Sequence, residues 1–192
     1  MAVVSTTVAR AQQSTPVDAY AAATRTYLDG QRIDMRQLAG ELGVSRNTLY
    51  RWTGGRELLI QDVAWELSES IIRDIWARTA EMSGPDRLIE ALRQYVVTIV
   101  NSHALQSFVR NETHAALRLL TARGPFQDRL VAEVRRLIDE EADRGTFTPR
   151  SDTAILAYGI VRLIEGFVYN GALIETDLPI DDALAVFRLL VD

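Results

Sequence analysis

The chain has 192 residues, with 21 basic and 26 acidic side chains and a formal net charge of −5. Cysteine and lysine are both absent, which excludes disulfides, thiol nucleophiles, cysteine-bound metals, Schiff bases and phosphate loops that end in Gly-Lys-Ser/Thr. No segment reaches the ~20 uninterrupted apolar residues of a membrane-spanning helix, and residues 1–14 lack the pattern of a signal peptide. We therefore expect a cytoplasmic protein that uses no cofactor.

Apolar residues recur at helical spacing along almost the whole chain, and no segment alternates long enough for a strand, so we predict an all-α protein. The small, polar residues 1–14 are expected to form a flexible arm. Thr15, Pro16 and Asp18 then combine a capping hydroxyl, a proline for the first helical position and a carboxylate three residues after the cap. Helices are expected at about residues 16–29, 35–42, 45–52, 56–81, 86–100, 103–123 with a joint near 110–111, 125–144, 151–174 and 180–191.

The segment 36–52 has the pattern of a helix-turn-helix. Ala39 is small enough for two helices to approach closely, Gly43 supplies a turn with left-handed backbone, and Ser45 can cap the second helix. The exposed face of that second helix is predicted to present the residues Arg46, Asn47, Thr48, Tyr50 and Arg51. Because arginine can bind guanine edges, asparagine can bind adenine edges and a helix N-terminus attracts phosphate, this face favours DNA binding.

The charge distribution agrees with that interpretation. Residues 32–56 contain five arginines and two acidic residues, so this segment carries +3 within a chain of −5. Residues 1–60 sum to +2 and the remainder to −7. The alternative is a polar surface helix whose arginines only keep the protein soluble. We expect a helix-turn-helix domain at residues 15–55, followed by a larger helical domain at 56–192.

The residues Gly43-Val-Ser-Arg-Asn-Thr-Leu-Tyr50, followed by Arg56-Glu-Leu-Leu59, resemble the end of the DNA-binding domain in the TetR family of bacterial regulators. The resemblance implies that Tyr50 holds a phosphate, that Thr48 contacts phosphate or base, and that Arg36 reaches the DNA from the preceding helix. Trp52 replaces the usual histidine, and Gly55 replaces a lysine whose phosphate contact Arg56 would take over. The expected DNA-binding residues are Arg36, Ser45, Arg46, Asn47, Thr48, Tyr50, Arg51, Trp52 and Arg56.

In this family the C-terminal helices form a homodimer and enclose a small-molecule pocket. The helix 151–174 is apolar nearly all round and must be covered on several sides, by a partner or by the core of a monomer. A lone helix-turn-helix binds its half-site weakly, which favours the dimer. The expected interface residues are Ile155, Ile160, Leu163, Phe167, Leu184, Phe187 and Val191.

Polar or aromatic residues on otherwise inward helix faces are candidates for the ligand pocket. They are Tyr95, Phe108, His114, Arg118, Tyr158, Glu165 and Tyr169. Each can instead be plain core or a solvated side chain, and Arg162 and Glu165 can simply pair with each other. A metal site at Glu112 and His114 is disfavoured, because residues two apart on a helix point to different faces.

These observations predict an all-α, two-domain transcriptional regulator, a repressor that binds a palindromic DNA operator as a homodimer and is released by a small-molecule effector. The arginine-only, alanine-rich chain with Ser45–Trp52 also resembles actinobacterial regulators of lactone or acyl-homoserine-lactone degradation. That resemblance implies a small, largely apolar effector with a carbonyl or a ring ester. The alternatives are a helical binding protein with a degenerate helix-turn-helix and, last, a small all-α enzyme, for which no Gly-x-Ser-x-Gly pattern is present.

Overall fold

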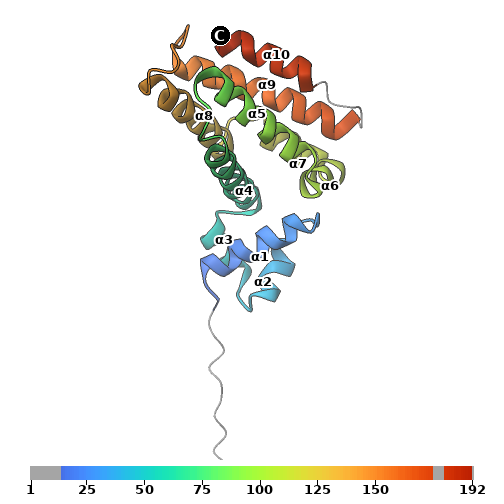
Figure 1. Cartoon of the computed structure of the whole chain (residues 1–192). Coiled ribbons are helices and arrows are strands. Elements are labelled where there is room, and N and C mark those ends of the chain that lie inside the picture. Colours follow the sequence, from blue (N-terminus) through green and yellow to red (C-terminus); the bar gives the residue numbers. More distant parts are fainter. Residues whose placement is uncertain (1–13, 175–179, 192) are drawn as a thin grey trace, which may run out of the picture.

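The computed structural model describes residues 14–174 and 180–191. Except for Ser14, the arm expected at residues 1–14 lies outside the described residues, as does the expected break at 176–179. Every regular element in the described part is a helix, which confirms the all-α prediction (Figure 1). The helices are α1 (Pro16–Leu28), α2 (Met35–Glu41), α3 (Arg46–Thr53), α4 (Arg56–Arg78), α5 (Gly84–Val100), α6 (His103–Asn111), α7 (Thr113–Thr121), α8 (Pro125–Asp143), α9 (Thr153–Ile174) and α10 (Ile180–Val191).

Helices α1, α2 and α3 and the start of α4 form a small head around one apolar cluster. The Thr15 hydroxyl accepts a hydrogen bond from the backbone N–H of Asp18, whose carboxylate accepts from the Thr15 N–H in return, so the predicted cap of α1 is confirmed. Gly43 makes the turn between α2 and α3 at φ +65°, as its position predicted. Asp34 caps α2 by accepting from two backbone N–H groups, a signal that our sequence analysis missed.

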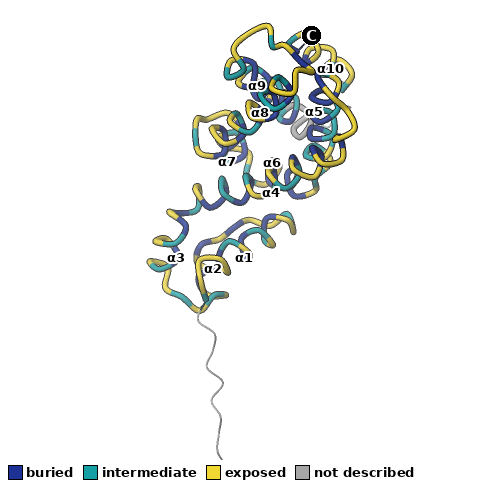
Figure 2. The backbone as a smooth tube through the Cα atoms, turned by 60° about the vertical axis from the view of Figure 1, so that its left-hand side comes forward, coloured by how far each residue is buried: buried dark blue, intermediate teal, exposed yellow. Residues whose placement is uncertain are grey.

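The remaining helices form the body, and α4 connects it to the head (Figure 1). Helices α8 and α9 make the most extensive helix pair. Helices α9 and α10 run antiparallel, so the beginning of α9 lies beside the end of α10 (Figure 1). The buried residues of all these helices form one continuous core, while the outer sides of the helices are exposed (Figure 2). The predicted joint after residue 110 is confirmed at Glu112, between α6 and α7.

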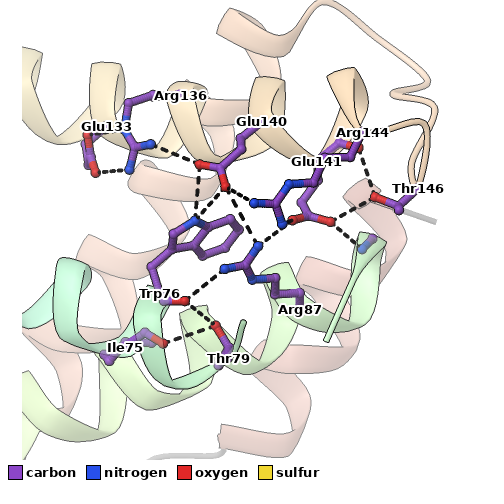
Figure 3. A network of polar contacts seen from close by, with 11 residues as sticks. Ile75, Trp76, Thr79, Arg87, Glu133, Arg136, Glu140, Glu141, Arg144 and Thr146 are labelled. Carbon is purple, nitrogen blue, oxygen red and sulfur yellow. Dashed lines mark hydrogen bonds and ion pairs between the residues drawn. The ribbon is translucent and has the colours of Figure 1, made fainter. Parts of the chain in front are cut away.

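A buried polar network fixes the C-terminal end of α4 to α5 and α8 (Figure 3). The guanidinium of Arg87 lies 3.7 Å from the centre of the Trp76 ring and donates to the Trp76 carbonyl at 2.8 Å. It also donates to Glu141 at 2.8 Å. Glu141 accepts further hydrogen bonds from the Gly84 backbone N–H at 2.6 Å and from the Thr146 hydroxyl at 2.8 Å. The body end of α4 is therefore held by several directional bonds at once.

The head also touches the body away from α4, through the end of α1. The rings of Tyr27 and Phe108 lie 5.6 Å apart, which joins α1 to α6. Gly30, at φ +69°, approaches α6 so closely that a Cβ atom there would lie 2.8 Å from the Ser107 hydroxyl oxygen. The head and the body thus share a second, non-covalent contact.

Candidate DNA-binding and effector sites

Helix α3 presents most of the expected DNA-binding side chains to solvent at the outer edge of the head (Figure 2). Arg46, Asn47, Tyr50 and Arg51 are exposed, and Arg36 is exposed on the neighbouring α2. Within the described residues, none of the three arginines makes an ion pair, so their guanidinium groups are available to phosphates or bases. The buried Leu49 holds α3 against the head core.

The N-terminus of α3 has a local hydrogen-bond arrangement of its own. The Ser45 hydroxyl accepts from the Thr48 backbone N–H at 3.1 Å, and the two hydroxyl oxygens lie 2.8 Å apart. Ser45 therefore caps the helix, and its position at the first turn is compatible with a phosphate contact. Trp52 is half-buried and packs against the core, so only part of its ring can reach DNA.

Arg56 is oriented differently from our expectation of a free phosphate contact. Its Nε donates to the Ile33 carbonyl at 2.7 Å, and its Nη2 donates to the Glu112 carboxylate. Arg32 approaches the same carboxylate at 3.6 Å. Because Glu112 attracts both cations, Arg56 joins α4 to the α6–α7 joint instead of pointing to solvent. A DNA contact by Arg56 would require these bonds to break.

Two apolar cavities lie in the body and share the side chains of Tyr95, Leu130 and Ile164. The smaller has a volume of about 40 Å³ and is lined by apolar side chains and Tyr95. The larger has a volume of about 120 Å³, and its polar lining side chains include Glu165. Cavities that are mainly apolar with a few polar groups are typical of small-molecule sites.

Tyr95 and Glu165, two polar groups of the larger cavity, are each hydrogen-bonded and have pKa values raised by burial. Tyr95 donates from its hydroxyl to Ser68 at 3.2 Å, and burial raises the pKa of Tyr95 to about 12. Glu165 accepts from Arg162 at 2.7 Å, yet burial outweighs this ion pair and raises the pKa of Glu165 to about 7. Near neutral pH the carboxyl group can therefore both donate and accept a hydrogen bond.

The expected pocket residues divide into two groups. Tyr95 and Glu165 line the larger cavity, Phe108 is buried against Tyr27, and Tyr169 is half-buried against the core. The expectation of an inward position is wrong for His114, Arg118 and Tyr158, which are exposed and line neither apolar cavity.

The outward direction of these three side chains follows from which positions of each helix face the core. Ala116, Leu119 and Leu120 occupy the inward face of α7, and Leu156, Ala157 and Ile160 occupy the inward face of α9, which turns the three polar side chains outward.

The expected dimer residues divide in the same way. Ile155 is 65% exposed, and Leu163, Phe167 and Leu184 are half-buried. Ile160, Phe187 and Val191 are at most 1% exposed within a single chain, so our expectation that they form an interface surface is wrong. Their side chains fill the core between α9, α10 and α5. Among the side chains of α9 and α10 whose burial is described, the large apolar ones that are exposed are Ile155, Tyr158, Val186 and Leu189.

A sequence model of the tetracycline repressor-like C-terminal domain matches residues 83–192, more than half of the chain. The chain belongs to the TetR family. No protein of curated function matches its sequence. Among solved structures, the transcriptional repressor QsdR of R. erythropolis, also from the TetR family, superposes with a TM-score of 0.85 and 25% identity, over 92% of this chain and 93% of QsdR.

Two further solved structures, each less than 25% identical to this chain, show the fold alone. The repressor AlkX of Dietzia sp. strain DQ12-45-1b superposes with a TM-score of 0.66 and 20% identity, over 93% of this chain and 95% of its own. The regulator FadR of Bacillus subtilis, solved in complex with stearoyl-CoA, superposes with a TM-score of 0.60 and 14% identity, over 93% and 98%. The chain therefore has the fold of a TetR-family transcriptional regulator. No helix in the described ranges is long and apolar enough to cross a membrane.

Three residues of this TetR-family chain gain importance that the sequence did not reveal. Tyr27 was not among the expected site residues, but it lines the larger cavity. Ser68 of α4, also not among them, accepts the hydrogen bond from Tyr95. Glu112 was considered only as a metal ligand, and the described part of the chain contains no cluster of three candidate metal ligands. The positions of these side chains follow from contacts between distant helices, which no local pattern contains.

Proposed function

We propose that the chain is a repressor that binds a palindromic operator as a homodimer and is released by a small, largely apolar effector. The observation that carries this proposal is the exposure of Tyr50 and of Arg36, Arg46 and Arg51 at α2 and α3. Among the described residues these three arginines make no ion pair, whereas Arg25, Arg32 and Arg56 are paired. Phosphate and base contacts need cations of this kind. Family membership and the cavities in the body support the same function.

The proposed dimer uses the outer faces of α9 and α10. Leu189 is 79% exposed and Ile155 is 65% exposed, and the antiparallel arrangement of the two helices brings the ends that carry them to the same side of the body. Exposed apolar surface of this kind is typical of protein interfaces. A dimer places two α3 helices in successive major grooves about 34–36 Å apart. An effector that binds better to a conformer with another spacing then releases the DNA.

The first experiment tests α3 as the recognition helix. Fluorescence anisotropy measures binding to the DNA beside the gene and to random DNA over a salt series. We expect the double variant Tyr50→Phe with Arg46→Ala to lose the preference for operator DNA. The salt slope should decrease by about 2, because each subunit of the dimer loses one cation that contacts the DNA. Arg110→Ala removes an exposed arginine from α6 of the body and serves as the control. A preserved preference in the double variant would show that α3 does not read the DNA.

The second experiment tests the dimer face. Light scattering after size exclusion is expected to give a dimer for the wild-type chain and a monomer for Leu189→Glu, because a buried, unpaired carboxylate is costly at an interface. Met82→Glu places the same charge on an exposed apolar residue between α4 and α5 and should remain dimeric. A wild-type monomer at micromolar concentration, or a dimeric Leu189→Glu variant, would contradict the assignment.

A further inference from the structure

The larger cavity of the body has one wall that belongs to the DNA-binding head. Tyr27 and Leu28, the last two residues of α1, line it together with side chains from α4 to α9. Tyr27 is 7% exposed and thus nearly enclosed, whereas Leu28 is 49% exposed and lies at the outer edge. A ligand in this cavity would therefore contact the head directly, in addition to any effect transmitted along α4.

The polar groups of the cavity converge near Tyr27. Tyr95 and Ser68 are hydrogen-bonded to each other, and Glu165 lies close enough to Tyr95 to contribute to its raised pKa. Burial, followed by the proximity of Tyr95, likewise raises the pKa of Tyr27. The Tyr27 hydroxyl makes no hydrogen bond within the described part of the chain. The residue is nearly enclosed, but its hydroxyl oxygen is not one of the fully buried side-chain atoms that lack a partner, so a ligand group in the cavity can reach it.

We propose that the effector site is shared between head and body, and that it takes an uncharged ligand with an apolar chain and one hydrogen-bonding group held by the Tyr27 hydroxyl. This inference rests on the proposed function, because it assigns the effector's site. Suitable groups are a hydroxyl, an ester or an amide. A carboxylate is disfavoured, since Glu165 faces the cavity while Arg162, whose Nη2 binds Glu165 and Gln127, does not line it.

The size of the cavity supports a role for the head wall in the response. A volume of about 120 Å³ is close to that of an engineered cavity of about 150 Å³ that holds one benzene ring. The cavity is partly open at the edge where Leu28 lies, so a longer ligand must extend past the end of α1 or displace a wall. The α4, α5 and α8 walls are connected by the buried network of Arg87 and Glu141. The α1 wall is joined to α6 by the Tyr27–Phe108 ring contact and to α4 by the partly buried hydrogen bond from Tyr20 to Asp62. In the proposed response the α1 wall yields, and it carries the head with it.

Photolabelling tests the shared site without a change in sequence. The probe is an eight-carbon alcohol with a diazirine close to its hydroxyl, irradiated with the wild-type chain and mapped by tryptic mass spectrometry. Because the chain has no lysine, trypsin cleaves only after arginine, so Tyr27 and Leu28 fall in peptide 26–32 and Tyr20 falls in peptide 11–25. We expect label in 26–32, reduced by excess 1-octanol, and none in 11–25. Label confined to peptides of the body would overturn the inference.

A matched pair of variants tests the hydrogen bond. Tyr27→Phe keeps the ring against Phe108 and removes only the hydroxyl, while Tyr20→Phe removes a hydroxyl that donates to Asp62 outside the cavity. Calorimetry with 1-octanol should show about five- to tenfold weaker binding for Tyr27→Phe and no change for Tyr20→Phe. Thermal melting confirms that both variants fold. Equal octanol affinity in Tyr27→Phe and wild type would refute the role of Tyr27.

Two wild-type measurements separate this inference from the function on which it rests. If the wild-type chain does not bind operator DNA, the proposed function is wrong, whether or not the chain binds 1-octanol. If it binds operator DNA but binds octanoate as tightly as 1-octanol, or binds neither, the assignment of an uncharged ligand fails while the repressor function stands. Operator release by 1-octanol that is weakened in Tyr27→Phe supports both.

Discussion

Glu141 and Glu165 are both buried in the body of the chain, but in opposite electrostatic settings. Glu141, which is 0% exposed, accepts hydrogen bonds from Gly84, Arg87 and Thr146 in the network at the end of α4 (Figure 3). Glu165, which is 6% exposed, faces the larger cavity and accepts from Arg162. The two carboxylates therefore differ in the number of donors around them and hardly at all in burial.

That difference decides the charge of each group. Burial raises the pKa of a carboxyl group, and hydrogen bonds to the charged form lower it. For Glu141 burial is the largest single influence, but the hydrogen bonds from Gly84, Arg87 and Thr146 together outweigh it and lower the pKa. For Glu165 burial prevails and raises the pKa to about 7. The hydrogen-bonded carboxylate of Glu141 stabilises the fold. The carboxyl group of Glu165 has fewer hydrogen bonds and can still form one with a ligand in the cavity.

The largest effect is expected when the bonded carboxylate is neutralised. Glu141→Gln leaves the buried guanidinium of Arg87 without its main counter-charge, and we expect a loss of about 3–5 kcal/mol in the free energy of unfolding. Urea denaturation monitored by circular dichroism measures it. The control is Asp139→Asn, two residues earlier on α8, which breaks an exposed ion pair with Arg135 and should cost less than about 1 kcal/mol. Equal losses in the two variants would show that the network is not the anchor of α4.

The sequence predicted the parts of the fold that depend on neighbouring residues. The cap at Thr15, the turn at Gly43, the cap at Ser45 and the ends of α10 all follow from local chemistry, and the structure has them. The pairing of Arg87 with Glu141 joins residues 54 positions apart, and no periodicity encodes it. Local signals therefore predicted the helices but not the contacts that hold them together.

For the candidate sites too, the sequence predicted what depends on local pattern and not what depends on contacts between helices. On the amphipathic helix α3 the exposed side is distinct, so most of the residues expected at the surface are found there, although Thr48 is half-buried. Helix α9 is apolar nearly all round, and its sequence alone cannot distinguish the side that packs inside the chain from the side left for a partner. For this reason Ile160 was assigned to an interface although it belongs to the core, whereas Ile155 is exposed.

The second prediction concerns the partly bonded carboxylate. Because folding raises the pKa of Glu165, the folded chain binds an extra proton between about pH 4.5 and 7. The contribution of Glu165 to the free energy of unfolding is fully present below pH 4.5 and is lost as the pH rises through about 7. Glu165→Gln imitates the protonated group at every pH. Urea titrations should show the variant gaining about 3 kcal/mol relative to wild type between pH 4.5 and 8. A difference that stays constant over this range would mean that Glu165 remains ionised in the fold.

The smallest effect on stability is expected at Glu112, whose side chain is 10% exposed and thus less buried than the other two. It is shared by Arg56 of α4 and Arg32 of the head, so Glu112→Gln should cost about 1–2 kcal/mol. Its effect on regulation should be clearer. Because this pair connects the α6–α7 joint to the start of α4, its loss should reduce the effector-induced change in operator affinity by about threefold, a part of the coupling of about 1–3 kcal/mol typical of such proteins.

A matched control exists at the residue next to Arg56 on α4. Glu57 lies in the first turn of α4 and approaches Arg118 of α7 at 3.6 Å, but both side chains are more than half exposed. Solvent screens such a pair, so Glu57→Gln should leave the coupling unchanged. Anisotropy titrations of operator DNA with and without 1-octanol, at equal salt, give the coupling for both variants. If the two substitutions reduce it equally, the signal does not pass through Glu112. If only Glu112→Gln reduces it, the partly buried contact at the α6–α7 joint carries part of the signal from the cavity to the head.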